Sequence, residues 1–482
     1  MPEMAGLRDH QIAPARQLLD ILRSGNGIDA SDTGVGKTYM AAWAARQIGV
    51  GTLAVVPKIS RTAWRNAAKH FGDTISVVGY EELRGGRTPY GTWQNTPPAG
   101  FRNEQYFVCQ CCQLPVNLDV QFQGCYTHPQ GIHCVQTKKK AWDYGKFTFA
   151  PEVKFLIFDE VHRCNAINSL NADLLIAARR QCIRTLGLSA TVGNSPLHFR
   201  ALGYLLDLHS LTNFSNWTRR FGCGKIAGMA GWHWLAGEDR QKEFMERLHS
   251  ELFPARGIRI RKADIPGFPS CTITPRLFDL ESLDKLNGLY AEMQSATESL
   301  DVRRKLDLNP DMGATKFLRQ RQHIELLKVP IAVELAEDYI AKGKSVVLFC
   351  NFSQTIVELS KRLNCLHIID GSPKRAAIRD RVLADMAADR VRKVIVNSEA
   401  GGVSISFKDE RGEFPREGIV FPPVSARTFL QLAGRLPRDG AKSHSNYTVI
   451  LAANSVEEKM FNNLNKKLDN ISLLNDGDLS LW

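Results

Sequence analysis

The feature that most constrains this chain is a short glycine-rich segment near its start, Ser31–Thr38, which reads SDTGVGKT. Gly34 and Gly36 let backbone N–H groups close around a phosphate, and a helix starting near Lys37 points its positive end at the same place. Lys37 would pair with the β- and γ-phosphates of a nucleotide, and Thr38 would hold Mg²⁺. Ser31 stands where the generic pattern has glycine, and a glycine-rich turn before an ordinary helix is the alternative interpretation.

Several short apolar runs, each followed by a helical pattern, predict an α/β fold with parallel strands. Runs of this length and apolarity are typical of strands buried on both faces, whose carboxyl ends carry active-site residues. The runs are 52–56, 154–158, 182–188, 345–350, 366–369, 393–396 and 447–451.

A pair of adjacent carboxylates follows the second of these runs. Asp159 and Glu160 stand in the segment Phe155–His162, which reads FLIFDEVH. Asp159 can hold the water shell of Mg²⁺, and Glu160 can orient and deprotonate an attacking water. An Asp-Glu pair alone is usually a solvated turn, but its place after a phosphate-binding loop favours the catalytic interpretation.

Two arginines lie close together in a late segment, Gln431–Gly440, which reads QLAGRLPRDG. Arg435 and Arg438 are three residues apart, so on a helix they share a face. They could reach a γ-phosphate from a second domain. Without the other motifs, a surface ion-pair pattern would be the default interpretation.

Further segments are Leu7–Gln11, Val55–Lys58, Val78–Leu83, Leu188–Thr191, Val347–Phe352 and Asn397–Ser404. In this order, together with the three motifs above, they resemble the superfamily 2 helicases over most of the chain. The resemblance implies two RecA-like lobes with ATP and Mg²⁺ bound between them, Gln11 reading the adenine, and Ser189 and Thr191 coupling hydrolysis to lobe movement. The implied nucleotide contacts are Gln11, Thr33, Gly34, Gly36, Lys37, Thr38 and Gln431. The implied nucleic-acid contacts are Pro57, Lys58, Tyr80, Asn351, Phe352 and Ser398.

Two stretches resemble the Swi/Snf-like branch of that superfamily. They are Thr191–Leu197 and the basic segment Ile258–Asp264. This resemblance favours DNA, duplex or single-stranded, over RNA, and the moderate length suggests a compact bacterial or phage-type relative. The chain departs from that branch at Ser189-Ala-Thr191, where Thr-Gly-Thr is usual, and at Ser404, where glycine is usual.

The pattern along the chain predicts how it divides into domains. We expect a first lobe at 1–230, interrupted by an insertion at 101–147. A helical connector is expected at 231–334, a second lobe at 335–468 and a polar tail at 469–482.

The insertion is rich in cysteine. Cys109, Cys112, Cys125 and His128 form a CxxC-x₁₂-CxxH pattern, which would give the tetrahedral ligand set of a structural Zn²⁺ site. Cys134 or His133 could replace His128 as the fourth ligand. Reduced, buried cysteines without metal are the alternative.

The charge and hydropathy of the chain limit its surroundings and partners. A formal net charge of +12 favours a polyanionic partner such as nucleic acid. The sequence has no run of roughly 18 uncharged apolar residues, so we expect no membrane span. The start of the chain lacks the pattern of a secretory signal, and we expect a reducing, cytoplasmic location, bacterial or phage-infected.

Three alternatives to a DNA motor stay open. The DEVH tetrad Asp159–His162 also resembles the signature of RNA helicases. A zinc-bearing nucleic-acid adaptor without hydrolysis is a second alternative, although the presence of Lys37, Glu160 and Arg435 argues against it. The chain could also be the motor subunit of a nuclease, replication or recombination system, with cutting supplied by a partner.

Overall fold

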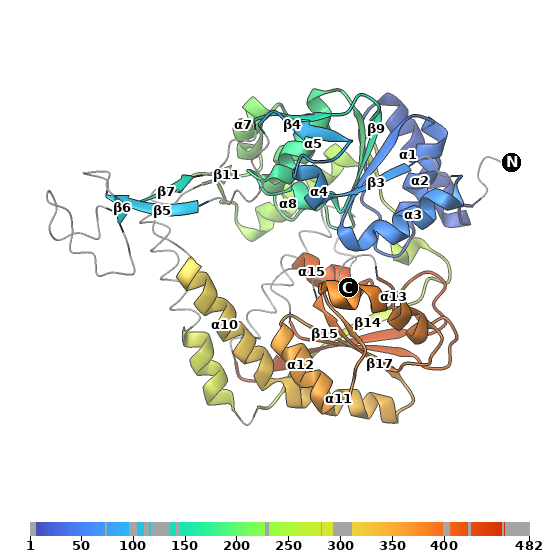
Figure 1. Cartoon of the computed structure of the whole chain (residues 1–482), viewed down its shortest axis with the longest axis vertical. Helices are drawn as coiled ribbons and strands as arrows, with labels where there is room; N and C mark the ends of the chain where they lie inside the picture. The colour runs from blue at the N-terminus through green and yellow to red at the C-terminus, as the bar shows by residue number, and fades with distance from the viewer. Residues whose placement is uncertain are drawn as a thin grey trace.

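The computed structural model describes residues 6–72, 75–95, 104–109, 115–116, 135–140, 145–226, 231–280, 282–292, 311–398, 405–422, 426–455 and 457. They form two α/β lobes, one above the other in Figure 1, and each lobe contains a six-stranded sheet. All strand pairs in both large sheets are parallel. The expected α/β fold with two RecA-like lobes is therefore confirmed.

The first sheet has the strand order β13-β1-β10-β9-β2-β3. Its strands are β13 (Gly257–Ile258), β1 (Gly27–Asp29), β10 (Arg184–Leu188), β9 (Phe155–Asp159), β2 (Thr52–Val56) and β3 (Ile75–Gly79). In β2 all residues are buried, with Leu53 and Val55 in one hydrophobic cluster and Ala54 and Val56 in another. Successive side chains of a strand point to opposite faces, so both faces of this sheet carry a core.

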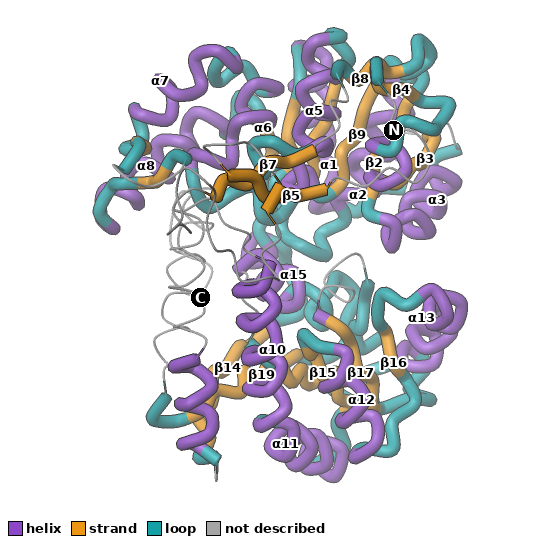
Figure 2. Tube along the Cα trace, turned by 60° about the vertical axis from the view of Figure 1, so that its left-hand side comes forward, coloured by secondary structure: helices purple, strands orange, loops and turns teal. Residues whose placement is uncertain are grey.

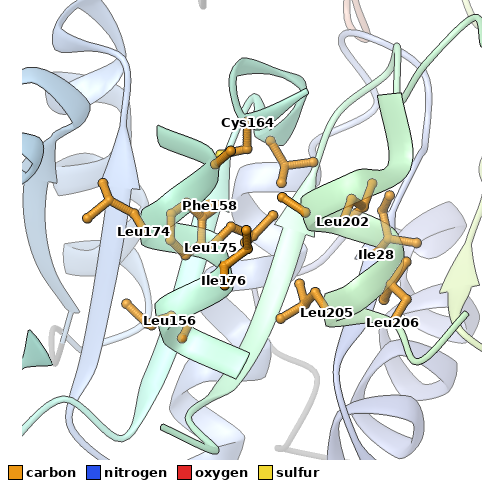
Figure 3. Packing of buried hydrophobic residues seen from close by; sticks show 14 of the residues in the cluster. Ile28, Leu156, Phe158, Cys164, Leu174, Leu175, Ile176, Leu202, Leu205 and Leu206 are labelled. Atoms are coloured by element: carbon orange, nitrogen blue, oxygen red, sulfur yellow. The ribbon is translucent and has the colours of Figure 1, made fainter. Parts of the chain in front are cut away.

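Helices cover the two faces of the first sheet. The helices α1 (Asp9–Ser24), α2 (Lys37–Ile48) and α3 (Arg61–His70) contribute to the cluster around Ala54 and Val56. The helices α4 (Tyr80–Arg84), α5 (Leu170–Arg180), α6 (Arg200–Leu205), α7 (Phe214–Arg219) and α8 (Glu238–Leu252) contribute to the other cluster. Figure 3 shows part of this second cluster, where Leu174 and Leu175 of α5 lie near Leu156 and Phe158 of β9, and Leu202 and Leu205 of α6 lie near Ile28 of β1.

The second sheet has the strand order β14-β19-β18-β15-β17-β16. Its strands are β14 (Cys271–Phe278), β19 (Ser445–Ala452), β18 (Arg416–Val420), β15 (Ser345–Cys350), β17 (Lys393–Asn397) and β16 (Ile368–Ile369). The helices α11 (Val329–Ala341) and α12 (Ser353–Arg362) cover one face, and α13 (Pro373–Ala387) and α15 (Ala426–Ala433) cover the other. In Figure 2 the helix α10 (Asp311–Leu327) runs beside α11 and α12, which it contacts.

The segment expected as a separate connector, 231–334, is divided between the lobes in the structure. Helix α8 packs into the first lobe, and β13 extends the first sheet. The chain then crosses to the second lobe, where β14 pairs with β19 along its whole length. The two lobes are therefore joined by the short stretch between β13 and β14.

The insertion leaves the first lobe through an antiparallel pair, β4 (Gly91–Trp93) and β8 (Phe147–Phe149). Beyond it, β5 (Glu104–Cys109), β6 (Pro115–Val116) and β7 (Val135–Lys140) form an antiparallel sheet that projects sideways in Figure 1. Of the predicted zinc ligands, only Cys109 lies in a described strand. Cys112, Cys125, His128, His133 and Cys134 lie outside the described residues. Within the described ranges no group of three or more His, Cys, Asp or Glu could hold a metal ion.

Among the helices that the structure describes, none is both long enough and apolar enough to cross a lipid bilayer.

Candidate nucleotide site between the lobes

A cleft of about 630 Å³ lies between the two lobes, and residues of both lobes line it. It brings together nearly all of the residues that the sequence predicted for nucleotide binding and hydrolysis. Those in the cleft are Gln11, Thr33, Gly34, Gly36, Lys37, Thr38, Asp159, Glu160, Arg435 and Arg438. Gln431 is buried in α15 and is not among the lining residues.

The glycine-rich loop connects β1 to α2 and has the backbone that a phosphate-binding loop needs. Gly34 and Gly36 have φ angles of 90° and 95°, which favour glycine strongly. A Cβ on Gly36 would also lie 2.0 Å from Nε2 of Gln11. The Gln11 side chain is buried against the loop, where its Nε2 donates to the carbonyl of Val35 at 2.8 Å and its Oε1 accepts from the backbone N–H of Arg8 at 3.0 Å. Gln11 therefore ties the first helix to the loop.

Lys37 is the first residue of α2, and its ammonium group is held by the loop itself. Its Nζ donates to the carbonyls of Ser31 at 2.7 Å and Asp32 at 2.8 Å. Burial lowers the pKa of Lys37, while the carboxylates of Asp29, Glu160 and Asp32 act in the opposite direction. A phosphate anion placed in the loop would give this ammonium a stronger partner than two carbonyls.

Asp159 ends β9, and two buried aromatic side chains bind it. Nε1 of Trp64 donates to Oδ2 of Asp159 at 2.9 Å, and the hydroxyl of Tyr80 donates to the backbone carbonyl of Asp159 at 2.9 Å. Burial and the neighbouring Glu160 carboxylate raise the pKa of Asp159 to about 7. A bound cation would favour the ionised form of this carboxyl.

Glu160 has a φ angle of 55°, which is uncommon for a residue with a side chain. Backbones of this kind are costly and are found preferentially at functional sites. The Glu160 carboxylate lies 3.3 Å from Nδ1 of His162. Nδ1 of His162 is also 2.9 Å from Oγ of Ser189, which accepts the backbone N–H of Thr191 at 3.1 Å. The predicted coupling residues thus contact the segment that carries the two acids.

Arg435 and Arg438 enter the cleft from the second lobe, just after α15. Nη1 of Arg435 donates to the carbonyl of Ile405 at 3.3 Å, and Nη2 of Arg438 donates to the same carbonyl at 3.0 Å. Burial lowers the pKa of Arg435 to about 10, although the nearby Glu160 carboxylate acts in the opposite direction. Burial and the charge of Arg435 lower the pKa of Arg438 to about 9. Both guanidinium groups stay protonated at neutral pH.

The two lobes touch at the loop. A Cβ on Gly434 would lie 1.7 Å from Oγ1 of Thr33, so the second lobe approaches the loop as closely as a glycine permits. A Cβ on Gly34 would lie 3.4 Å from Cγ of Arg438. Farther out, Arg8 of the first lobe forms an ion pair with Asp439 of the second.

The donor set of the cleft fits a triphosphate with Mg²⁺. The loop offers backbone N–H groups at positions that only glycine fills without strain, and Lys37 supplies a cation. Thr38 and Asp159 supply the hydroxyl and carboxylate oxygens that Mg²⁺ prefers. We assign these two residues as the ones that would hold the metal.

The residues predicted to contact nucleic acid do not line one common cleft, unlike those predicted for the nucleotide. Lys58 is exposed, whereas Pro57, Tyr80 and Ser398 are buried. The side-chain amide of Asn351 donates to Oε2 of Glu325 at 2.7 Å within the second lobe. Phe352 lies under the guanidinium of Arg321, whose Cζ is 5.7 Å from the ring centroid. Their contact with nucleic acid stays a prediction.

Several residues that line the cleft were not among the nucleotide contacts predicted from the motifs. They are Gly6, Arg8, Val35, Tyr39, Ala63, Trp64, Asn66, His70, Ser406, Lys408 and Asp439. Trp64 stands six residues after Lys58 and belongs to none of the sequence motifs. Only the fold places it beside Asp159.

No family model matches the chain. A putative ATP-dependent RNA helicase of Acanthamoeba polyphaga mimivirus is 31% identical to it over 469 residues, which cover 94% of this chain and 80% of the relative. The chain belongs to the superfamily 2 helicases. This helicase also aligns with solved structures of S. cerevisiae Dbp5 bound to RNA and ADP BeF3, over 96% of its own length and 92% of the solved chain, with 9% identity and a TM-score of 0.46. A Dbp5 variant in the same state gives a TM-score of 0.45.

Membership of the superfamily confirms the resemblance on which the motif assignments were based. The Swi/Snf-like branch, the zinc site and a bacterial or phage origin of this helicase stay predictions.

Proposed function

We propose that this protein is a nucleic-acid-dependent ATPase motor whose catalytic site forms between its two lobes. The observation that supports the proposal is the cleft itself. It places Lys37, Asp159 and Glu160 of the first lobe opposite Arg435 and Arg438 of the second. Residues with complementary roles in phosphoryl transfer thus come from two different lobes.

Each side chain has a distinct role in the proposed reaction. Lys37 binds the β- and γ-phosphates, and the glycine-rich loop orients them. Glu160 orients the attacking water and accepts its proton, while Arg435 and Arg438 stabilise the negative charge that develops on the γ-phosphate. A bound Mg²⁺ supplies charge neutralisation at the phosphate oxygens. Because the arginines belong to the second lobe, hydrolysis requires the closed arrangement of the lobes.

The second part of the proposal concerns which nucleic acid the motor acts on. The relative at 31% identity is named as an RNA helicase, and we take RNA as the first substrate to test. DNA is the second candidate, because Thr191–Leu197 and Ile258–Asp264 resemble the Swi/Snf-like branch. In both cases we expect contacts to the phosphate backbone, so that binding weakens as the salt concentration rises.

The test is ATP hydrolysis by the wild type and by Glu160→Gln, each alone and with single-stranded RNA, single-stranded DNA or duplex DNA. We expect stimulation by nucleic acid in the wild type and a rate lowered by about 10²–10⁴-fold in the variant, because the water loses its general base. Glu152→Gln, at an exposed position of the same lobe, is the matched control and should behave as wild type. The nucleic acid that stimulates most identifies the substrate class. If the wild type does not hydrolyse ATP with any of them, the motor proposal fails and the adaptor alternative replaces it.

A structural Zn²⁺ in the insertion is a separate part of the proposal and rests on the spacing of Cys109, Cys112, Cys125 and His128. Metal analysis of the purified protein should find about one zinc per chain. Cys112→Ser should lower the zinc content, while Cys182→Ser, which changes an exposed free cysteine outside the insertion, should not.

A further inference from the structure

Trp64 is a fully buried residue of α3 whose indole reaches the nucleotide site. Its Nε1 donates to Oδ2 of Asp159 at 2.9 Å, and both residues line the cleft. The backbone of Asp159 has a second buried donor, the hydroxyl of Tyr80 in α4, at 2.9 Å. The residue assigned to Mg²⁺ is thus bound by one aromatic side chain at its carboxylate and by another at its carbonyl.

We propose that Trp64 and Tyr80 are positioning residues that orient Asp159 for Mg²⁺ and connect it to the nucleic-acid-facing segments of the first lobe. The inference rests on the proposed ATPase function and adds a coupling route to it. It also gives Tyr80 a different role from the direct nucleic-acid contact that the sequence predicted.

An indole is suited to hold a carboxylate in one orientation. Its N–H is a donor only, and it lies in the plane of a rigid ring, so its direction cannot change as that of a hydroxyl or a water can. Trp64 has no exposed surface, which means that its neighbours fix the ring. The terminal torsion of an aspartate is otherwise broad, and one strong hydrogen bond to Oδ2 restricts it.

The elements that carry the two aromatic residues adjoin the segments predicted to touch nucleic acid. Helix α3 begins at Arg61, three residues after the exposed Lys58, and α4 begins at Tyr80 itself. An ion pair of 2.7 Å between Arg61 and Glu82 joins α3 to α4. If bound nucleic acid displaced either helix, the displacement would therefore shift Asp159 through its two buried hydrogen bonds.

This arrangement offers a physical route for stimulation of the ATPase by nucleic acid. Groups that orient a metal ligand typically change metal affinity or activity by about 10–100-fold when they are removed. Trp64 and Tyr80 orient Asp159 in this way. They belong to helices that follow β2 and β3, at the carboxyl ends of the strands, where the nucleotide site also lies. The same two hydrogen bonds can thus serve Mg²⁺ binding and its response to nucleic acid.

The test is equilibrium binding of a fluorescent ADP analogue to the full chain at increasing Mg²⁺ concentration, measured for wild type, Trp64→Phe and Tyr80→Phe. We expect Trp64→Phe to raise the Mg²⁺ concentration for half-maximal binding by about 10-fold or more. Binding without Mg²⁺ should stay unchanged, because the glycine-rich loop and Lys37 are intact. Trp217→Phe is the matched control, since Trp217 is also buried in the first lobe and its Nε1 has no hydrogen-bond partner among the described residues.

Tyr80→Phe keeps the ring and removes only the hydroxyl, so it can decide the matter even if Trp64→Phe does not fold. Its Mg²⁺ half-saturation should shift in the same direction, by about 3–10-fold for one hydrogen bond. In both variants, the factor by which nucleic acid stimulates ATP hydrolysis should also fall. Half-saturation values within twofold of the Trp217→Phe value in the folded variants would overturn the inference. Absence of Mg²⁺-dependent nucleotide binding in the wild type would instead count against the proposed function.

Discussion

Gly36 shows how much of the site depends on the absence of one side chain. It has a φ angle of 95°, and it lies directly under the amide of Gln11. The Gln11 amide could avoid a new methyl group only by giving up its hydrogen bond to the carbonyl of Val35. Conformation and close contact therefore both require glycine at this position.

We predict that Gly36→Ala destabilises the protein more than Gly267→Ala does. Gly267 also has a positive φ, 71°, but a Cβ there would meet nothing within 4 Å. Both variants should lose about 1–2 kcal/mol for the left-handed backbone. Gly36→Ala should lose about 1–2 kcal/mol more, because a buried hydrogen bond is broken. Chemical denaturation of the three proteins measures the difference, and equal losses would contradict the role of Gln11.

At the scale of elements, the stretch that joins the two lobes is bound to the nucleotide loop. After β13, Arg259 forms an ion pair of 2.8 Å with Asp32 of the loop. The other oxygen of Asp32 accepts the backbone N–H of Lys262 at 2.9 Å, and Oγ of Ser31 accepts that of Ile260 at 3.0 Å. Lys37 donates to the carbonyls of the same two loop residues, so phosphate-binding and lobe-joining segments share Ser31 and Asp32.

Arg259→Met should therefore destabilise the first lobe. The side chains of Arg259 and Asp32 are 8% and 18% exposed, and removal of one partner leaves the other charge partly buried. We expect a loss of about 3 kcal/mol in the free energy of unfolding. Arg261→Met is the control, because the ion pair of Arg261 with Asp264 is more exposed, at 35% and 53%, and its removal should have little effect.

The same ion pair makes a prediction about pH. Burial raises the pKa of Asp32, but Arg259 and Lys262 outweigh it, and the net shift is downward. A carboxyl with a lowered pKa in the folded state stabilises the fold above its unfolded pKa, about 3.9, and loses this contribution as the pH falls through the folded value. The stability difference between wild type and Arg259→Met should therefore be full at neutral pH and shrink below about pH 4. A difference that stays constant down to pH 3 would show that Asp32 is not the partner that matters.

At the scale of the whole molecule, function depends on how closely the lobes approach. Thr33 and Gly434 meet across the cleft, and Arg435 and Arg438 stand one and four residues after Gly434. An alanine at position 434 would hold the lobes apart and draw the arginines back from Lys37 and Glu160. A misplacement of reacting groups by about 1 Å can lower the rate of a reaction by about 10²-fold.

We predict that Gly434→Ala lowers nucleic-acid-stimulated ATP hydrolysis by about 10–100-fold, with little change in the folding of either lobe. Gly371→Ala is the control, because a Cβ at that position of the second lobe meets nothing within 4 Å. Steady-state kinetics and a thermal unfolding scan of both variants test the prediction. A variant at position 434 with wild-type kcat would show that the arginines act without this contact.

The local motifs of the sequence determined the class of fold and most of the nucleotide site. Strands at 52–56 and 345–350 have the predicted bounds. The strand predicted at 154–158 is shifted by one residue at both ends, and the one predicted at 393–396 is one residue longer. These features could be predicted because a buried strand, a glycine-rich turn and a carboxylate after a strand depend on the chemistry of neighbouring residues.

Contacts between distant segments were decided only by the tertiary structure. Residues 271–278 form an edge strand with several exposed side chains, so no continuous apolar run marked them as part of the second sheet. The bonds of Trp64 and Tyr80 to Asp159, the ion pair of Arg259 with Asp32 and the contact of Gly434 with Thr33 join residues far apart in the chain. Such pairs leave no periodic pattern in a single sequence, because each depends on how whole helices, sheets and lobes pack together.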